Sequence, residues 1–201
     1  MVDERVELIE AMKTLVILGM TNPRGGNGSI RVESSRILIT PSGLAKHRLT
    51  IEDLVEYDLE TGQYTGRYRP SIEVNAHAQI YKRIPEAKAV LHAHTPLALA
   101  LTDIGLENWW LAGPLEVKYS VGNVSIAKPA EPGTLELALN IAEEVEKGAN
   151  LVIVPMHGVF AWGTSVHSAL DAIVTLEETA KYVFTRKVLE SLKGITRILS
   201  R

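Results

Sequence analysis

Apolar positions recur along the chain with two different periods, and these periods separate the expected helices from the expected strands. A spacing of three and four residues places apolar side chains on one face of a helix. Proline or glycine marks the end of several of these runs, as Pro85 and Gly148 do. Helices are expected at residues 3–20, 70–85, 95–105, 133–148 and 165–192.

Runs rich in β-branched residues predict the strands. Strands are expected at residues 29–32, 36–40, 53–66, 88–95, 117–128 and 151–163. The first two flank a Glu-Ser-Ser turn, the third is a hairpin that turns near Thr61-Gly62, and the last is either two strands or one strand bent around His157-Gly158. Because hairpins come first, we expect one α/β domain with a largely antiparallel sheet and not a doubly wound parallel sheet.

The bulk composition restricts the class of protein and of partner. The 201 residues suffice for one core, and 46% hydrophobic with 22% charged residues is ordinary for a soluble globular domain. A net charge of −3 gives no basic field, so neither nucleic acid nor an anionic membrane is expected as a partner. Cysteine is absent, which excludes disulfides and thiolate ligands. No secretory signal and no span of roughly 20 apolar residues is found, so we expect a cytoplasmic protein with one domain over residues 1–201.

Two of the six histidines, His92 and His94, stand one residue apart in a short apolar run. Residues two apart in a strand point to the same face, so both imidazoles can reach one metal ion. A divalent ion needs neutral imidazoles and usually a third protein ligand. The alternative is that these are two unrelated polar residues on an exposed strand face. The apolar neighbours weaken this alternative, because buried histidines without partners cost free energy.

The other four histidines are candidates for the third ligand. His157 follows an apolar run and precedes a glycine, at a chain reversal where its side chain can enter a cleft. His47 lies among basic residues and is expected at the surface, whereas His167 is expected to serve local structure at the start of the last helix. His77 lies four residues after Glu73 on one expected helix, so these two share a face.

Glu73 is the carboxylate best placed to act as a base beside such a metal. It lies in the first turn of a helix whose expected N-cap is Ser71. A glutamate there equally complements the helix dipole, for about 0.3–1 kcal/mol, and on spacing alone this is the simpler role. The spacing E-x-x-x-H is not the H-E-x-x-H signature, so a metalloprotease has no support.

Three turns are rich in the hydrogen-bond donors that bind phosphate. GGNGS, residues 25–29, offers backbone N–H groups with the Asn27 and Ser29 side chains, but a strand follows it, so it is not a dinucleotide or P-loop fingerprint. TPSG, residues 40–43, ends a strand, and Pro70-Ser71 opens a helix whose free N–H groups favour an anion. Each is by itself an ordinary turn. They form a phosphate site only if they converge in space, which the sequence does not decide.

Five motifs taken together, GGNGSIRV, ITPSG, RPSIE, LHAHTP and PMHG, resemble in order and spacing the class II sugar-phosphate aldolase family. This family includes L-fuculose-1-phosphate aldolase, and the adducin head shares its fold. The resemblance covers roughly residues 5–190. It implies a three-layer domain, in which helices flank a central, largely antiparallel sheet, and a homotetramer with active sites between subunits.

The resemblance also implies a site and a reaction. His92, His94 and His157 match the ligands of one Zn²⁺ per subunit, with another divalent metal as an alternative. Glu73 matches the catalytic acid/base, which also serves as a metal ligand when substrate is absent. The matches to the phosphate loops are Gly26, Asn27, Ser42, Gly43 and Ser71. The implied reaction is zinc-dependent retro-aldol cleavage of a ketose 1-phosphate, such as L-fuculose 1-phosphate, to dihydroxyacetone phosphate and a short aldehyde, or the reverse condensation.

Three departures from the family pattern leave the substrate open. The motif often reads P-S-S-E, and Ile72 here removes one hydroxyl. The family's epimerases carry Asp where this chain has Glu73, which favours an aldolase over a pentulose-phosphate 4-epimerase. No tyrosine follows Tyr182 to match the C-terminal catalytic tyrosine of the fuculose enzyme, and Tyr119, near Glu116, has no clear mid-chain match.

Other functions remain as alternatives. A metal-dependent epimerase or a thiosugar-phosphate dehydratase would keep the metal and change the reaction. A scaffold like the adducin head has no need of metal ligands, and since all three histidines and Glu73 are present, an enzyme is favoured. Trp109 and Trp110 suit either a subunit interface or the domain core.

Overall fold

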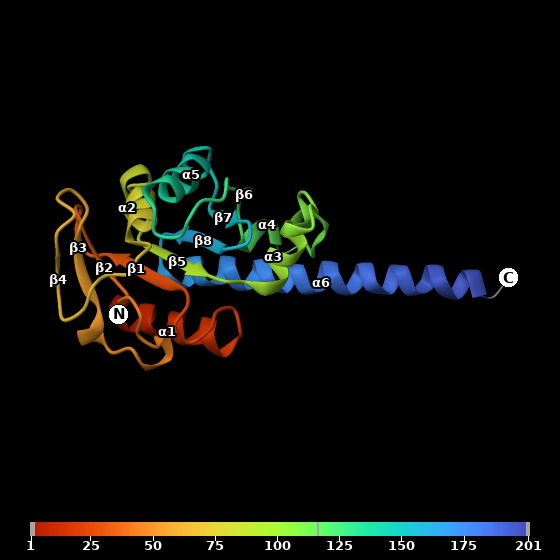
Figure 1. Ribbon diagram of the computed structural model, residues 1–201, viewed down its shortest axis with the longest axis horizontal. Coiled ribbons are helices and arrows are strands. Elements are labelled where there is room, and N and C mark those ends of the chain that lie inside the picture. The colour runs from red at the N-terminus through yellow and green to blue at the C-terminus, as the bar shows by residue number, and fades with distance from the viewer. Residues whose placement is uncertain (1–2, 116, 200–201) are drawn as a thin grey trace.

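The computed structural model describes residues 3–115 and 117–199. Within these residues the chain forms one eight-stranded sheet in the order β4-β3-β2-β1-β5-β8-β7-β6 (Figure 1). All neighbouring strands are antiparallel except β6 and β7, which are parallel. Helices cover both faces of the sheet, so the expected three-layer α/β fold with a largely antiparallel sheet is confirmed.

The element bounds follow the predicted order. The strands are β1 (Asn27–Arg31), β2 (Arg36–Ile39), β3 (Val55–Asp58), β4 (Tyr64–Thr65), β5 (Ala89–Ala93), β6 (Val124–Ile126), β7 (Leu151–Val154) and β8 (Gly158–Gly163). The helices are α1 (Glu4–Ile17), α2 (Val74–Arg83), α3 (Pro96–Asp103), α4 (Val117–Ser120), α5 (Leu135–Glu146) and α6 (Val166–Leu199). None of the helices in the described part of the chain combines the length and apolar character needed to cross a membrane.

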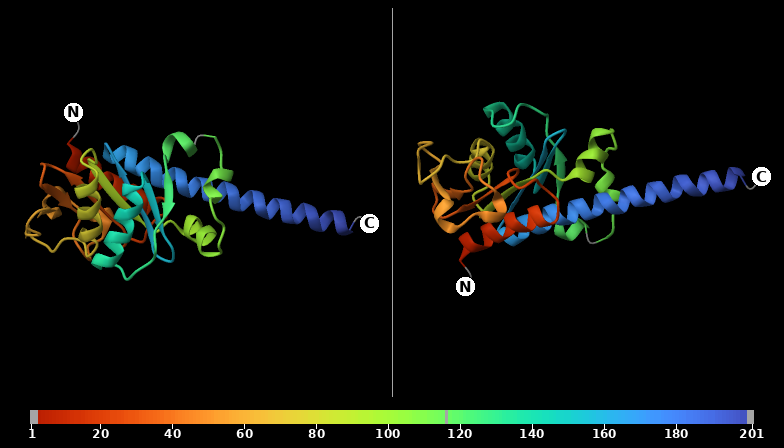
Figure 2. Two further views of the ribbon diagram at one scale, coloured as in Figure 1. Left: turned by 90° about the horizontal axis from the view of Figure 1, so that it is seen from above. Right: turned by 60° about the horizontal axis from the view of Figure 1, so that its bottom comes forward.

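The sheet separates two apolar cores. One core lies under α2 and α5 and includes Val90 and Phe160. The other lies under α1 and α6 and includes Leu91 and Ile153. Figure 2 shows these two helix pairs on opposite sides of the sheet, with α6 extending past the domain. The central strand β5 is buried on both faces, which explains why its sequence is an almost continuous apolar run.

Side-chain caps begin α1 and α5 close to the expected residues, and a glycine follows the end of α5. The Asp3 carboxylate accepts a hydrogen bond from the Arg5 N–H at the start of α1, and the Thr134 hydroxyl accepts one from the Leu137 N–H in α5. Gly148 follows α5 with φ +100°, a conformation that favours glycine. The last helix continues beyond the expected end at Leu192.

The expectation of a strand across residues 117–128 is wrong in part. Val117–Ser120 form the short helix α4, and β6 covers only Val124–Ile126. The reason is that Val117 and Val121 lie four residues apart and both are buried in the core, a spacing that belongs to a helix. Trp109 and Trp110 are 3% and 8% exposed in the same core, so they close the domain.

The start of α2 also differs from the prediction. The helix begins at Val74, and Ser71 is not its N-cap. The N–H of Ser71 donates to the carbonyl oxygen of Thr40, and Pro41 and Pro70 form an isolated bridge, so this stretch runs extended beside the end of β2. The consequence is that Glu73 takes the N-cap position, one residue before the helix.

Candidate active site

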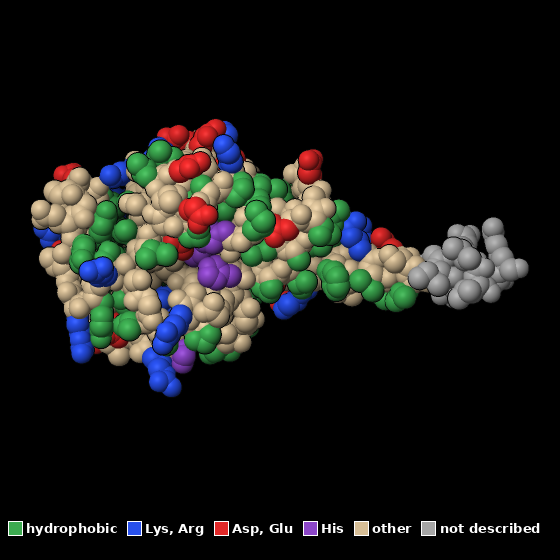
Figure 3. Space-filling view, in the orientation of Figure 1, with side chains coloured by type: hydrophobic (Ala, Val, Ile, Leu, Met, Phe, Trp, Pro, Cys, Tyr) green, Lys and Arg blue, Asp and Glu red, His purple; other side chains and the backbone are tan. Residues whose placement is uncertain are grey.

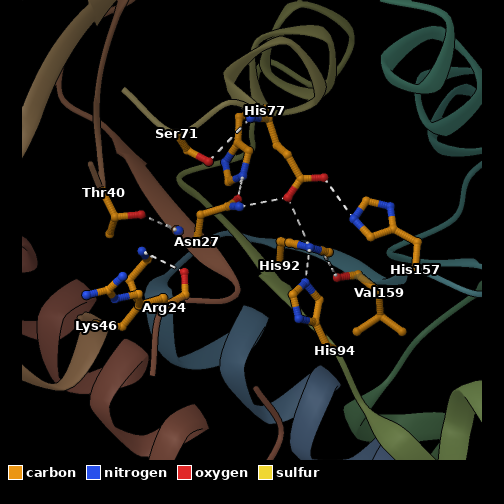
Figure 4. A network of polar contacts seen from close by, with 12 residues as sticks. Arg24, Asn27, Thr40, Lys46, Ser71, His77, His92, His94, His157 and Val159 are labelled. Carbon is orange, nitrogen blue, oxygen red and sulfur yellow. Dashed lines mark hydrogen bonds and ion pairs between the residues drawn. The ribbon is translucent and has the colours of Figure 1, made fainter. Parts of the chain in front are cut away.

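Three histidines from two distant segments converge beside the sheet (Figure 4). His92 lies on β5 on the side of α2 and α5, fully buried, and its ring stacks on Phe160 with 4.1 Å between centroids. His94 is not on the strand, because β5 ends at Ala93 and the His94 N–H donates to Met20 O at 2.8 Å. The prediction that both histidines lie on the strand is therefore wrong for His94. The two imidazoles still lie together as expected, with their Nε2 atoms 3.1 Å apart. His157 enters from the turn between β7 and β8.

Glu73 joins the histidines and does not cap its helix. Its Oε2 lies 3.1 Å from His92 Nε2, and its Oε1 lies 3.0 Å from His157 Nε2. Its side chain makes no capping hydrogen bond, so the simple dipole role is not what the structure shows. Burial raises the pKa of this carboxyl, but His92 and His157 outweigh burial and hold the pKa well below its usual range. Glu73 is therefore ionised near neutral pH.

The donor set fits a divalent cation. His92 Nδ1 donates to Val159 O at 2.9 Å, which leaves the Nε2 lone pair facing Glu73 and His94. Burial, with smaller contributions from His92 and His157, lowers the pKa of His94 to about 4, so this ring is neutral at pH 7. The ligand atoms of the three histidines lie within 4.8 Å of one another. A tetrahedral metal with bonds of about 2.0–2.1 Å places its ligands roughly 3.3 Å apart, close to the 3.1 Å between the His92 and His94 Nε2 atoms.

A glycine in the PMHG motif lets the histidines meet. A Cβ on Gly158 would lie 2.5 Å from Ala93 O and 2.6 Å from His92 Cε1. A Cβ on Gly25 would come within 2.9 Å of the His94 ring. Contacts that short require the backbone or the imidazole to move, so both glycines are needed for the approach of these loops. This gives a physical reason for the glycines in two of the motifs.

A cleft of about 400 Å³ connects the histidines with the donor-rich turns. All five residues matched to the phosphate loops line it, namely Gly26, Asn27, Ser42, Gly43 and Ser71. The cleft opens at the surface, where Figure 3 shows histidine side chains in the middle of the domain. The three turns thus converge in space, which is the condition that the sequence left undecided.

The Asn27 and Ser29 side chains form hydrogen bonds inside the protein, with Glu73 and His77 respectively. Asn27 Nδ2 donates to Glu73 Oε2 at 2.9 Å, and the fully buried Ser29 hydroxyl lies 2.7 Å from His77 Nδ1. His77 is also fully buried and does not reach the other histidines as a ligand. Burial, with a smaller effect of His92, lowers the pKa of His77 to about 3, so this ring is neutral.

Lys46 is a cleft residue that the sequence analysis missed. It is 2% exposed, and its Nζ donates to the carbonyl oxygens of Leu44 at 3.0 Å and of Arg24 and Pro41 at 3.4 Å each. Burial lowers its pKa to about 8, and no carboxylate among the described residues forms an ion pair with it. The run Lys-His-Arg at residues 46–48 resembles a solvated surface segment, so only the fold reveals that its first member is buried.

The remaining candidates lie away from the cleft. His47 is exposed, as expected. His167 is also exposed, and its Nε2 lies 3.8 Å from a carboxylate oxygen of Glu7 on α1, so its contact is with another helix and not local to the start of α6. Tyr119 is 78% exposed on α4, and Glu116 lies outside the described residues.

Comparisons with known proteins agree with this architecture. Residues 6–184 match the model of the family "Class II Aldolase and Adducin N-terminal domain". The chain is 36% identical over 181 residues to methylthioribulose-1-phosphate dehydratase of Methylococcus capsulatus, covering 85% of this chain and 88% of the dehydratase. It is 33% identical over 170 residues to 3-oxo-tetronate 4-phosphate decarboxylase of Haemophilus influenzae, covering 83% and 80%.

A solved structure extends the comparison to an aldolase. The crystal structure of L-fuculose-1-phosphate aldolase from Thermus thermophilus superimposes with a TM-score of 0.79 at 28% identity, covering 94% of this chain and 96% of the aldolase. The family resemblance and the mixed sheet with its flanking helices are thereby confirmed. Together, the match over residues 6–184, the identities and the shared fold show that the chain belongs to the class II aldolase and adducin N-terminal domain family.

Proposed function

We propose that this chain is a zinc-dependent lyase that cleaves a ketose 1-phosphate by a retro-aldol reaction, giving dihydroxyacetone phosphate and a short aldehyde. One observation supports this most strongly. An ionised carboxylate, Glu73, lies within 3.1 Å of a three-histidine cluster at one end of a cleft whose other end is lined by phosphate-type turns. The same histidines and glutamate disfavour the scaffold alternative, since a scaffold has no need of them.

Different residues of the cleft bind the phosphate and the reacting end of the substrate. The turns at residues 25–27 and 42–43, together with Ser71 and the positive charge of Lys46, bind the phosphate. The N–H groups of Gly25 and Ser42 already donate to the carbonyl oxygens of Asn22 and Arg69, so Gly26, Gly43 and the serine hydroxyls supply the donors. His92, His94 and His157 hold the cation, which when bound supplies a Lewis acid for the carbonyl and adjacent hydroxyl oxygens. Imidazole ligands leave the ion its full charge, and this choice of ligands is compatible with zinc.

Glu73 transfers the proton to and from C3, the reacting carbon. In the condensation direction its carboxylate takes a proton from C3 of dihydroxyacetone phosphate, and the electron pair of that C–H bond moves toward the C2 oxygen to give an enediolate. In the cleavage direction the C4 hydroxyl gives its proton to the Glu73 carboxylate, C4 becomes the aldehyde carbonyl, and the C3–C4 bond breaks with its electrons left on C3. Glu73 then returns its proton to C3 and releases dihydroxyacetone phosphate.

The names of the two relatives point to the same intermediate. Decarboxylation of a 3-oxo-tetronate 4-phosphate leaves its electron pair on the carbon next to the carbonyl, which again gives the enediolate of dihydroxyacetone phosphate. Dehydration of a ketose 1-phosphate begins with loss of the C3 proton and ends with departure of the C4 hydroxyl. All three reactions therefore pass through an enediolate and use one group that delivers a proton to carbon or removes one from it, and they differ in which bond beside the enediolate breaks.

Dehydration is the second candidate, and two cleft residues favour it. Ile72 and Met156 line the cleft and are 64% and 80% exposed. Ile72 stands where the aldolase motif often has a second serine. Apolar side chains at this entrance suit the thioether end of a methylthioribulose phosphate better than a polyhydroxylated chain. The 36% identity to the dehydratase supports the same candidate.

We further infer a single domain over residues 1–201 and a homotetramer. The part of α6 that extends past the domain exposes apolar side chains at Phe184, Val188, Leu189 and Leu192, which copies of the chain would cover. Light scattering with size-exclusion chromatography tests this assembly. A monomer at micromolar concentration contradicts it.

The function is tested by proton exchange at C3 of dihydroxyacetone phosphate in heavy water, followed by NMR with and without a chelator. Metal-dependent exchange is expected, because every version of the reaction uses the same proton transfer. Incubation with dihydroxyacetone phosphate and a set of short aldehydes, and separately with methylthioribulose 1-phosphate, then identifies the bond that breaks. No exchange by the zinc-loaded protein would contradict an enolising lyase.

A further inference from the structure

Four buried polar side chains form a hydrogen-bonded series that ends at Glu73. It runs from Asn27 through His77 and Ser29 to Tyr81, and these residues are 4%, 0%, 0% and 1% exposed. Asn27 and Ser29 come from β1, whereas His77 and Tyr81 lie one turn apart on α2. Figure 4 shows the Asn27 amide beside the His77 ring, and its Nδ2 lies 2.9 Å from Glu73 Oε2. Buried polar groups of this kind cost free energy unless each finds a partner.

The chemistry of the partners fixes the direction of every hydrogen bond. An ionised Glu73 only accepts, so the Asn27 Nδ2 faces it at 2.9 Å and Asn27 Oδ1 faces His77. His77 Nε2 must then donate to that oxygen, at 2.5 Å. Neutral His77 consequently accepts at Nδ1 from the Ser29 hydroxyl at 2.7 Å, and Tyr81 Oη lies 3.0 Å from both Ser29 Oγ and Ser29 O, where it donates. From Ser29 through His77 and Asn27, the donors point along the chain toward Glu73.

This series of hydrogen-bonded side chains gives the two carboxylate oxygens of Glu73 different partners. Oε2 accepts from Asn27 and lies against His92 Nε2. Oε1 is buried, has no partner with hydrogen-bond geometry among the described residues, and lies toward His157. A flipped Asn27 amide would present its oxygen to the carboxylate and repel it, and His77 is the group that prevents this flip.

We propose that His77 is a positioning residue, which locks the Asn27 amide so that Glu73 is tethered through Oε2 and exchanges protons with substrate through Oε1. This rests on the proposed function of Glu73 as the proton carrier. His77 itself touches neither substrate nor cation. A merely structural His77 would instead act through packing, since its ring meets the edge of Phe160 with 6.1 Å between centroids.

The test compares two substitutions at one position in the full-length, zinc-loaded protein. His77→Gln keeps an N–H near the position of Nε2 and an acceptor for Ser29, whereas His77→Leu keeps apolar volume and loses both. For proton exchange on dihydroxyacetone phosphate, His77→Leu is expected to lower kcat about 10- to 100-fold with KM and zinc affinity within about threefold. His77→Gln is expected to recover kcat to within about threefold of the unmodified protein.

A second readout does not depend on activity. In ¹⁵N-labelled protein, the side-chain amide protons of Asn27, assigned from their loss in Asn27→Asp, are expected to exchange slowly in the unmodified protein and in His77→Gln. They are expected to exchange fast in His77→Leu. Tyr81→Phe, at the far end of the chain, removes one hydroxyl and serves as the matched control with a smaller effect on both readouts.

The outcomes separate this inference from the proposed function. Slow amide exchange that is unchanged in His77→Leu overturns the inference, and so does equal loss of kcat in both His77 variants. If the unmodified protein performs no exchange on dihydroxyacetone phosphate, the proposed function fails. The amide readout then still decides whether His77 locks Asn27.

Discussion

The two ends of the cleft are built in different ways. At the histidine end, side chains from β5 and the residue after it, the turn after β7 and the start of α2 meet, and their nitrogen and oxygen atoms form the site. At the other end, three turns line the cleft, and Lys46 adds a buried charge. The first end depends on side-chain identity and the second on loop shape. Single substitutions should therefore abolish function at the histidine end and weaken it by degrees at the other.

The largest effect is expected from Glu73→Gln. The amide cannot carry the proton to and from C3, so kcat for exchange on dihydroxyacetone phosphate should fall about 10²- to 10⁴-fold with little change in KM. Zinc content after dialysis, measured by mass spectrometry, should stay near that of the unmodified protein because three imidazoles remain. Unchanged kcat would remove Glu73 from the role of proton carrier.

His94→Ala tests the metal site itself. Loss of one of three imidazoles should weaken zinc binding by more than about 100-fold, since even the outer partners of ligands contribute 10- to 100-fold in other metal sites. Activity should then return only at high added zinc. His167→Ala is the matched control, because that histidine is exposed and far from the cluster. Equal zinc affinity in the two variants would contradict the assignment.

This difference between the two ends also explains how far the sequence could predict the site. Side-chain chemistry is readable in a sequence, so His92, His94, His157 and Glu73 could be selected before their positions were known. Their geometry could not, because the strand stops at Ala93 when His94 bonds to Met20, and α2 starts late when Ser71 pairs with Thr40. These are long-range backbone contacts that no local pattern records.

The turn-built end was less predictable for a related reason. Glycine and serine turns are common, and only the fold brings the three together. Lys46 has the sequence context of a surface lysine, and its burial depends on carbonyl groups that two other turns supply. The fold itself was easier to predict, since apolar periodicity reports burial directly. It failed at residues 117–128, where a short helix is too brief to show a period.

Lys46→Met is expected to have a graded effect. The substitution keeps the buried stem and removes a charge that faces the phosphate turns without a carboxylate partner among the described residues. KM for dihydroxyacetone phosphate should rise about tenfold through loss of this nearby charge, whose three N–H groups are held by carbonyl oxygens, while kcat stays within about threefold. Lys46→Arg should recover little, because the larger guanidinium does not fit a 2% exposed site. An unchanged KM with lower thermal stability would make Lys46 purely structural.

The smallest and most specific effect is a pH dependence confined to the turn-built end. A phosphate monoester loses its second proton near pH 6, and burial lowers the pKa of Lys46 to about 8. The dianion and the charged lysine therefore coexist only between about pH 6 and 8. Competitive inhibition by glycerol phosphate should be tightest in that window and should weaken a few-fold as pH rises from 8 to 9.

Lys46→Met separates this titration from other groups that lose protons above pH 8. In the variant, the inhibition constant for glycerol phosphate should be larger at every pH and should no longer change between pH 8 and 9. A slope that persists in Lys46→Met would place the titrating group at the histidine end. The two ends would then share control of phosphate binding, and the division between them would be wrong.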